Sequence, residues 1–324
     1  MNAHRPYSHV ACALAVVLTI FATAVGSAPA AHARPTESLA PQLFATPADA
    51  GRALYQAAKA NKVPALRAVL GHGSGRIINS GDPEEDAQGR ARFVTAYERG
   101  AHIEMHGKAK AILVLGEHDW PFPFPLIKSG KQWRFDTRAG RDEVLARRIG
   151  RNELSTIQAA LAYVDAQRDY ALRSATKNGE QSYAQRFVSL PEAHDGLYWQ
   201  TGLGETPSPM GPLFASAAHE GTPGTLTAPY HGYYFRIVYA QGPHAPGGVT
   251  DYIVKGKMIG GFALVAYPAR YRASGVKTFI VNHDGIVYSK DLGPDTGAIA
   301  QAIERYDPDS SWHRETAEGK PAGQ

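Results

Sequence analysis

Cysteine is nearly absent from this chain, and that absence removes several kinds of chemistry. Cys12 is the only cysteine among 324 residues, and it comes too early in the N-terminal apolar stretch to be a lipoprotein cleavage site. Without that stretch the protein has no thiol, so disulfide bonds, cysteine nucleophiles and cysteine-ligated zinc are excluded. The protein must then fold on its hydrophobic core alone, for which 44% hydrophobic residues are sufficient.

A long membrane-spanning run is also missing. Residues 10–25 are apolar, but this run is shorter than the roughly 20 residues that favour a membrane span. It follows Arg5 and precedes two small-residue cleavage sites, which end at Ala30 and Ala33. This pattern predicts a signal peptide over residues 1–33, and hence a periplasmic or secreted cell-envelope protein with no stable membrane span after cleavage. An uncleaved N-terminal anchor is the alternative.

The excess of positive over negative charge is small as well. The formal net charge is +4, and loss of Arg5 with the signal peptide lowers it by one, to +3. An excess this small and this evenly spread argues against a nucleic-acid partner. An envelope protein or a glycan is the expected kind of partner, and the charge says nothing about the oligomeric state.

Helix and turn signals divide the first half of the mature chain. Residues 34–45 are rich in proline and alanine and predict a linker, and residues 46–138 predict an N-terminal α+β domain. Its first helix is announced by a Thr46 cap and a proline at the first helical position, and strands are expected at residues 111–115 and 132–136. Small helices followed by a sheet that ends in KQWRFD resemble the nuclear transport factor 2-like cone fold.

A long helix and a β-rich domain are predicted next. Residues 139–176 repeat apolar side chains at helical spacing, whereas residues 177–312 alternate apolar and aromatic runs with turn signals. Asp284-Gly285 predicts a hairpin with a two-residue turn, a terminal helix is expected after Gly293-Pro294, and residues 313–324 predict a polar tail. The fold class is therefore α+β: N-terminal helices with a small, cone-like antiparallel sheet, a long connecting helix, and a C-terminal antiparallel β-rich domain with a terminal helix.

Several longer motifs carry a family resemblance. They are WRFDTRAGRDEVLARRIGRNEL at residues 133–154, DGLYW at 195–199, PYHGYY, GGFALVAYP, and KDLGPDTGAIAQAIERYDPDSSW at 290–312. Through them nearly the whole mature chain resembles a bacterial exported family known as domain of unknown function 2950. The resemblance implies no catalytic residues, because that family carries no established activity.

A looser likeness concerns pilin-type exported domains. It depends on an N-E-x-x-x-I pattern at Asn152, Glu153 and Ile157, and on an A-Q-x-x-Y pattern at Gln167 and Tyr170. This chain has no prepilin-like apolar helix at the start of the domain, which argues against filament assembly.

One metal site can be considered. On a strand, His102, Glu104 and His106 would share one face, and imidazole with carboxylate suits zinc. The spacing is not the H-E-x-x-H of helical zinc proteases, and the alternative is a solvated polar strand face. No cofactor is predicted.

Aromatic and polar residues gather around predicted loops of the C-terminal domain. Such surfaces bind sugars or peptides through stacking and hydrogen bonds, although aromatic residues in a β domain also form cores. The ligand-binding candidates are Asp195, Tyr198, Trp199, Tyr230, His231, Tyr233 and Tyr234.

No complete catalytic motif is present. Ser74 and Ser208 lie in turns rich in glycine or proline, but neither has the G-x-S-x-G elbow of an α/β-hydrolase. The favoured hypothesis is therefore a non-enzymatic binding or assembly module of the cell envelope. One alternative is a periplasmic hydrolase with His231 and Asp195 in a pocket between the two domains. Another is a small-ligand carrier, which needs an apolar cavity of at least about 300 Å³ in the N-terminal cone.

Overall fold

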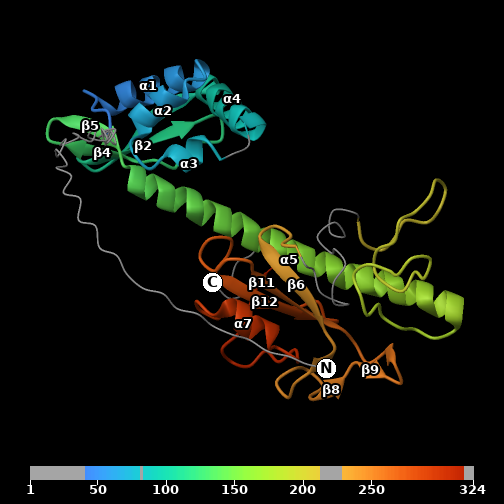
Figure 1. Cartoon of the computed structure of the whole chain (residues 1–324). Coiled ribbons are helices and arrows are strands. Elements are labelled where there is room, and N and C mark those ends of the chain that lie inside the picture. Colours follow the sequence, from blue (N-terminus) through green and yellow to red (C-terminus); the bar gives the residue numbers. More distant parts are fainter. Residues whose placement is uncertain (1–40, 81–82, 212–227, 317–324) are drawn as a thin grey trace, which may run out of the picture. The chain divides into compact units, whose positions relative to one another are not determined.

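The computed structural model describes residues 41–80, 83–211 and 228–316, all of which belong to a compact unit that begins at Leu39. The predicted signal peptide and most of the linker lie outside these residues. Within the described ranges, no helix is both long enough and apolar enough to cross a membrane. The fold is α+β, as the sequence predicts, and it contains two separate hydrophobic cores (Figure 1).

The first core lies between four helices and an antiparallel sheet. The sheet has the strand order β1-β2-β4-β5, and β3 pairs with β2. The elements are α1 (Pro47–Lys59), α2 (Val63–Leu70), α3 (Gly75–Ile78), α4 (Pro83–Arg99), β1 (Ala101–His106), β2 (Lys110–Leu115), β3 (Trp120–Pro121), β4 (Leu126–Ser129) and β5 (Gln132–Phe135).

Local signals account for most of these boundaries. The Thr46 side chain accepts a hydrogen bond from the Asp49 backbone N–H at 3.1 Å, which caps α1 as predicted. The α2 helix ends at Gly71, whose positive φ of 86° a side chain would oppose. By contrast, α4 is a 17-residue helix with no buried residue.

One helix, α5 (Thr137–Asn178), contributes to both cores. Asp136 caps its first turn, and Gly179 ends it in the left-handed conformation, as the Asn-Gly pair predicts. Val144 packs against the first core, while Tyr163 and its buried neighbours belong to the second. The apolar repeat of this helix is thus divided between two packing surfaces.

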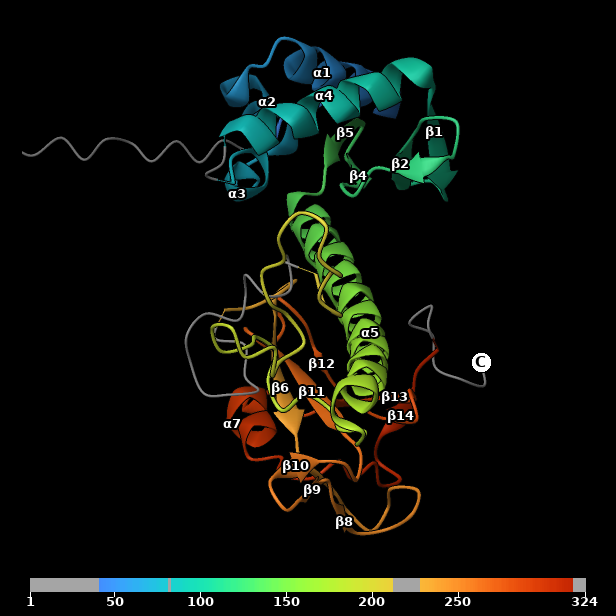
Figure 2. The same ribbon diagram turned by 90° about the vertical axis from the view of Figure 1, so that its right-hand side faces the viewer.

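The second core is built on the antiparallel sheet β14-β13-β12-β11-β6. The long helix α5 contacts β11, β12 and β13, and α7 contacts β11 from the opposite side of the sheet (Figure 2). Every residue of β11 is buried, as expected for a strand covered on both faces. The elements are β6 (Tyr233–Val238), β7 (Ala240–Gln241), β8 (Thr250–Asp251), β9 (Ile253–Val254), β10 (Lys257–Met258), β11 (Ala263–Pro268), β12 (Lys277–Asn282), β13 (Val287–Asp291), α7 (Thr296–Gln301) and β14 (His313–Arg314).

The hairpin predicted at Asp284-Gly285 is confirmed, but the prediction that its turn has two residues is wrong. The last strand pair is Val281 with Val287, so five residues form the connection. Asn282 accounts for the difference, because its side-chain oxygen accepts from the Asp284 N–H at 3.1 Å and organises a longer turn. A two-residue turn occurs instead at His231-Gly232, where both φ angles are positive, at 48° and 77°.

The C-terminal domain also extends further than its predicted end at residue 312. The β14 strand pairs with β13, and the Glu315 carboxylate is buried beyond it. Glu315 accepts from Lys277 Nζ at 2.6 Å and from Ser289 Oγ at 2.5 Å. These contacts bring the start of the expected polar tail into the sheet, a long-range pairing that local composition does not reveal.

Candidate functional site

The DGLYW motif is held in place by backbone and side-chain contacts. The Asp195 carboxylate accepts from the Leu190 N–H at 2.8 Å and lies 3.2 Å from Arg186 Nε. Gly196 packs so closely that a Cβ atom there would lie 2.6 Å from the backbone N of Ser189. Leu197 is fully buried in the second core. These contacts therefore fix the position of the last residue of the motif, Trp199.

Trp199 lines an open cleft of about 770 Å³ on the C-terminal domain. Its indole stacks against the His194 imidazole, with ring centroids 4.6 Å apart and planes 19° apart. The Arg173 guanidinium lies 6.0 Å from the indole centroid. The described lining residues come from α5 and from the segment after it, and are Tyr170, Arg173, Ser174, Ala193, His194, Asp195, Trp199, Gly204, Glu205 and Thr206.

The polar groups of this cleft are held by other protein atoms. Arg173 makes a two-pronged contact with Asp169, at 3.0 and 2.6 Å, and donates to the Pro207 carbonyl at 2.7 Å. Burial raises the pKa of Tyr170, and the nearby Asp195 carboxylate adds to this shift. Tyr170 therefore stays protonated, and its hydroxyl donates to the His194 carbonyl at 3.3 Å. The side chains of Tyr170 and Arg173 are thus held by hydrogen bonds within the protein.

The structure divides the seven sequence-predicted ligand residues into two groups. Asp195 and Trp199 share the cleft, and Tyr198 packs against the second core beside them. The other four, Tyr230, His231, Tyr233 and Tyr234, lie at the start of β6 and are not among the described residues of the cleft.

The second group has a structural role. The His231-Gly232 turn is closed by reciprocal backbone hydrogen bonds between Tyr230 and Tyr233, at 2.8 and 3.0 Å. The Tyr233 side chain is fully buried, which raises its pKa, and its hydroxyl donates to the Lys277 carbonyl at 3.0 Å. Tyr234 packs against Tyr267 with ring centroids 5.7 Å apart. These residues form and support the first turn of the sheet.

The proposed hydrolase pair is not assembled. Across the described ranges, no hydrogen bond or ion pair joins Asp195 to His231. Asp195 is paired with Arg186, and His231 occupies a left-handed turn position with its ring against Tyr230. The buried Ser74 hydroxyl is also engaged in a structural hydrogen bond, because it donates to the Gly71 carbonyl at 2.8 Å.

The predicted metal ligands lie on an edge strand. His102, Glu104 and His106 are all exposed on β1, and Glu104 Oε1 lies 3.2 Å from His106 Nε2. Among the residues that the structure describes, no three histidine, aspartate or glutamate side chains are grouped as a metal site. On this strand the three residues form a solvated polar face.

The residues of the N-E-x-x-x-I and A-Q-x-x-Y patterns anchor α5 to the rest of the second core. Asn152 donates to the Ser274 carbonyl at 2.8 Å, and Glu153 accepts from the backbone of Val276 and Lys277 at 2.9 and 3.1 Å. Gln167 is fully buried, and its amide makes two hydrogen bonds to the backbone of Ala184. These residues satisfy loop backbone groups that would otherwise be buried without partners.

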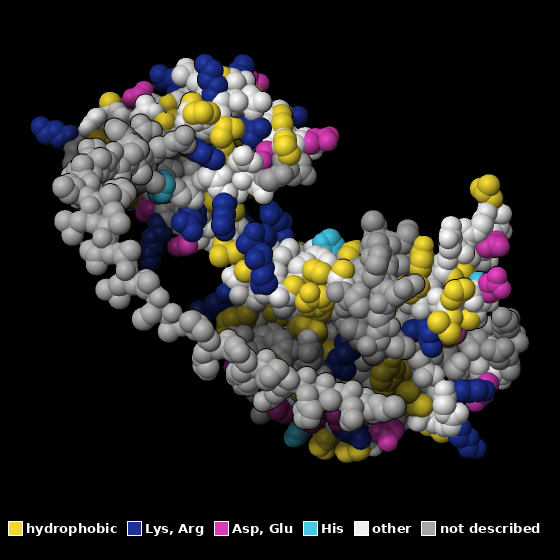
Figure 3. Space-filling model, in the orientation of Figure 1, with side chains coloured by type: hydrophobic (Ala, Val, Ile, Leu, Met, Phe, Trp, Pro, Cys, Tyr) yellow, Lys and Arg dark blue, Asp and Glu magenta, His cyan; other side chains and the backbone are white. Residues whose placement is uncertain are grey.

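Positive side chains gather over the first half of α5 (Figure 3). Arg147 pairs with Glu143 of the same helix at 2.7 Å, and it also donates to the Pro121 carbonyl at 2.9 Å. Its guanidinium lies 5.1 Å from the Trp120 ring centroid. Arg147 thus connects the helix to β3 of the first core.

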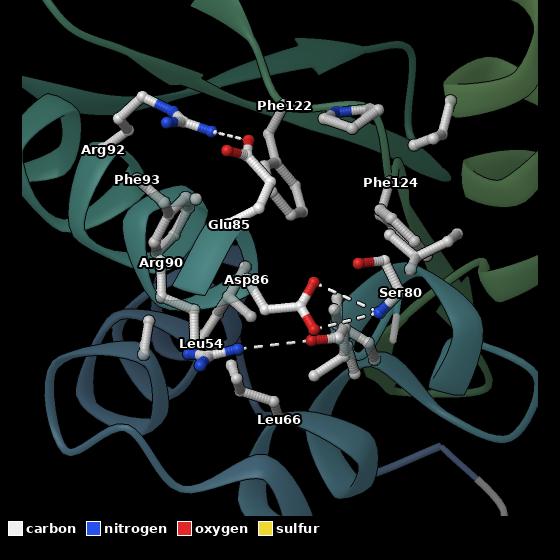
Figure 4. Close-up of a pocket in the computed structure, with 17 residues that line it drawn as sticks. Leu54, Leu66, Ser80, Glu85, Asp86, Arg90, Arg92, Phe93, Phe122 and Phe124 are labelled. Atoms are coloured by element: carbon white, nitrogen blue, oxygen red, sulfur yellow. Dashed lines mark hydrogen bonds and ion pairs between the residues drawn. The ribbon is translucent and has the colours of Figure 1, made fainter. Parts of the chain in front are cut away.

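A second cavity, of about 370 Å³, lies in the first core under α4 (Figure 4). Its wall is largely apolar and aromatic, and its rim carries the Glu85–Arg92 ion pair at 2.7 Å. This volume exceeds the minimum of about 300 Å³ for the small-ligand alternative. The first core therefore borders a pocket that is large enough for a small ligand and open to solvent.

Sequence reasoning missed most of the groups around Trp199. His194 directly precedes the DGLYW motif, so its proximity was available from the sequence. Arg173 and Tyr170 are more than 20 residues away on α5, and only their spacing of three along a helix could have suggested a shared face.

The architecture is that of an α+β protein in which one long helix contributes to two hydrophobic cores, one with a buried sheet and one with an open pocket beside α4. A family model described as "Protein of unknown function (DUF2950)" matches residues 41–314, and the chain belongs to this family. No match was found among curated proteins, and none among solved structures.

Proposed function

We propose that this protein is an exported, non-enzymatic binding module of the cell envelope, and that its C-terminal domain binds a glycan at the Trp199 cleft. The observation that carries the proposal is the stacked His194–Trp199 pair, which borders an open cleft of about 770 Å³. Flat aromatic surfaces beside hydrogen-bonding groups suit the alternating apolar and hydroxyl faces of a sugar ring.

The polar lining of the cleft supports a glycan. Glu205, Thr206 and Asp195 provide oxygen atoms beside the aromatic pair, and both cationic and anionic groups are represented. Asp195 and Arg173 already have protein partners, so the cleft presents no uncompensated charge from either of them. A neutral, hydroxyl-rich ligand fits this balance better than a highly charged one.

The rigidity of the cleft supports binding without chemistry. The backbone around Trp199 is tied to its neighbours by hydrogen bonds from Leu197 to Arg186 and from Tyr198 to Phe187, at 3.1 and 2.8 Å. A surface held in this way loses little conformational entropy when it binds a ligand. The candidate base His231 and the candidate acid Asp195 each have a structural role, which favours a binding module over the hydrolase alternative.

Calorimetric titration with soluble amino-sugar oligosaccharides and peptidoglycan fragments tests the glycan proposal. The unchanged chain should bind, and Trp199→Ala should weaken binding by about tenfold or more, since stacking residues commonly dominate such sites. Trp312→Ala is the matched control, because Trp312 belongs to the same domain but does not line the cleft among the residues described. Binding that survives in Trp199→Ala, or binding of peptides alone, would count against the proposal.

Export is tested separately by cell fractionation and N-terminal sequencing. Cleavage at either predicted site gives a mature chain that begins at Arg34 or Ala31. A full-length chain that stays in the membrane fraction would support the anchor alternative, and a cytoplasmic chain would contradict export.

A further inference from the structure

The α4 helix packs on the first core through partly buried side chains, among them Phe93 and Tyr97, and polar contacts hold its first half. It has no buried residue, yet several polar contacts fix its position. Asp86 accepts from the Ser80 N–H at 3.1 and 3.0 Å, and Arg90 donates to Asn61 Oδ1 at 2.6 Å and to the Ile78 carbonyl at 3.2 Å. These contacts place the helix without filling the space beneath it.

That space is lined by aromatic rings. Phe93 of α4 faces Phe122 across the cavity wall, with ring centroids 5.4 Å apart, and Phe122 lies 5.6 Å from Phe124 (Figure 4). Leu54 and Leu66 contribute the floor from α1 and α2. The lining therefore suits an apolar body and gives it several flat surfaces to pack against.

Gly89 forms part of the cavity wall at the middle of α4. Glycine is among the poorest helix formers, and interior helical glycines usually permit a close approach. Here a Cβ atom would meet only the end of Arg92, at 3.8 Å, so packing does not require glycine. Because Gly89 has no side chain, the cavity is wider next to α4.

The charged groups at the rim are all paired within the protein. Glu85 pairs with Arg92 at 2.7 Å, Asp86 holds the Ser80 backbone, and Arg90 holds Asn61 and Ile78 (Figure 4). A ligand with a carboxylate or an ammonium group would have to displace one of these contacts. An uncharged ligand would leave every contact in place.

From these observations we infer that the cavity beneath α4 is a binding site for a small, uncharged, lipophilic molecule. The cavity of about 370 Å³ lies within the range of small-ligand sites. This site is separate from the glycan cleft, and neither proposal depends on the other.

Fluorescence titration of the full chain with the neutral probe N-phenylnaphthylamine tests the site. We expect saturable binding of one probe per chain. Gly89→Phe should weaken it by at least about tenfold, because the new ring occupies the space that the probe would fill. Gly89→Ala should bind as the unchanged chain does, since a methyl group takes little of the volume. The anionic probe anilinonaphthalene sulfonate should bind more weakly than the neutral one.

Two controls separate this site from other sources of signal. Gly150→Phe places the same side chain on α5 where nothing lies within 4 Å of the new Cβ atom, and it should leave binding unchanged. Trp199→Ala should also leave it unchanged, which separates the cavity from the glycan cleft. Far-ultraviolet circular dichroism and a melting curve confirm that Gly89→Phe folds.

Several results would overturn the inference. Probe binding that persists in folded Gly89→Phe would place the probe elsewhere, and tighter binding of the anionic probe would contradict an uncharged ligand. A chain that sediments as a dimer and becomes monomeric in Gly89→Phe would show that a second copy covers the cavity instead. Absence of any saturable binding would also reject the site.

Discussion

The two cores hold their helices in different ways. In the second core, α5 is tied to the sheet by buried polar side chains, with Gln167 fully enclosed, and β11 is buried along its whole length. In the first core, α4 packs through side chains that are only partly buried, and an open pocket lies beside it. The difference shows that one chain can combine a filled core, which gives stability, with a partly empty one, which has room for a ligand.

The largest expected effect contrasts two leucines. Leu264→Ala, at a buried position of β11, should lower the free energy of unfolding by about 2–5 kcal/mol, because packed atoms surround this side chain. Leu66→Ala should have a smaller effect, near the lower end of that range, because Leu66 already borders a cavity and has fewer contacts to lose. Urea unfolding measures both, and equal losses would contradict the contrast between the cores.

Next in size is the buried amide of α5. Gln167→Leu should destabilise the protein by ~3 kcal/mol, since it leaves the Ala184 N–H and carbonyl buried without their partners. Gln56→Leu, at an exposed position of α1, is the control and should change stability little. Urea unfolding monitored by circular dichroism gives both values. A small effect for Gln167→Leu would mean that its hydrogen bonds are readily replaced.

A third change examines the support of the cleft. Gly196→Ala should destabilise the protein by about 1–3 kcal/mol, because its Cβ atom would lie 2.6 Å from the Ser189 backbone. It should also weaken glycan binding by moving Trp199. Gly202→Ala meets only ordinary contacts, the closest at 3.5 Å to the Glu205 side chain, and should be nearly neutral. Thermal melting and glycan titration measure both effects, and a fully stable Gly196→Ala that binds normally would contradict this role of the motif.

The smallest effect concerns an exposed ion pair. The His244 ring donates a hydrogen bond from Nδ1 to the Asp307 carboxylate at 3.0 Å, which raises the pKa of His244, and the charge of Asp307 adds to the shift. Because the folded pKa lies above the unfolded one, the stabilisation is fully present below the unfolded value and is lost as the pH rises through the folded one. Nuclear magnetic resonance titration of the ring should show a raised pKa that Asp307→Asn lowers. An identical titration in both proteins would rule out the pairing.

Local sequence patterns predicted most of the elements. The Thr46 cap and the apolar repeat of α5 both act through neighbouring residues, so one sequence is enough to recognise them. The prediction of a two-residue turn at Asp284-Gly285 was wrong because the Asn282 side chain accepts a hydrogen bond from the Asp284 backbone N–H. A turn of this kind depends on a residue outside the Asp-Gly pair.

The candidate sites were predicted only in part. Asp195 and Trp199 were recognised because they belong to one motif, whereas Arg173 reaches the same cleft from a helix that precedes it. The sequence places Tyr233 beside a loop and so makes it a ligand-binding candidate, but in the folded protein its side chain is completely buried. The cavity beneath α4 has no sequence signal of its own, because an empty volume depends on what several separate elements fail to fill.

The amino-acid sequence by itself determined that this chain has no cysteine beyond Cys12, that it is α+β with a long central helix, and that no complete catalytic motif runs along it. Only the tertiary structure decided which aromatic residues line a cleft and which fill a core. The physical reason is that periodicity, capping and composition act over a few residues, while burial and the meeting of side chains depend on segments more than a hundred residues apart, as the contact between Asn152 and Ser274 shows.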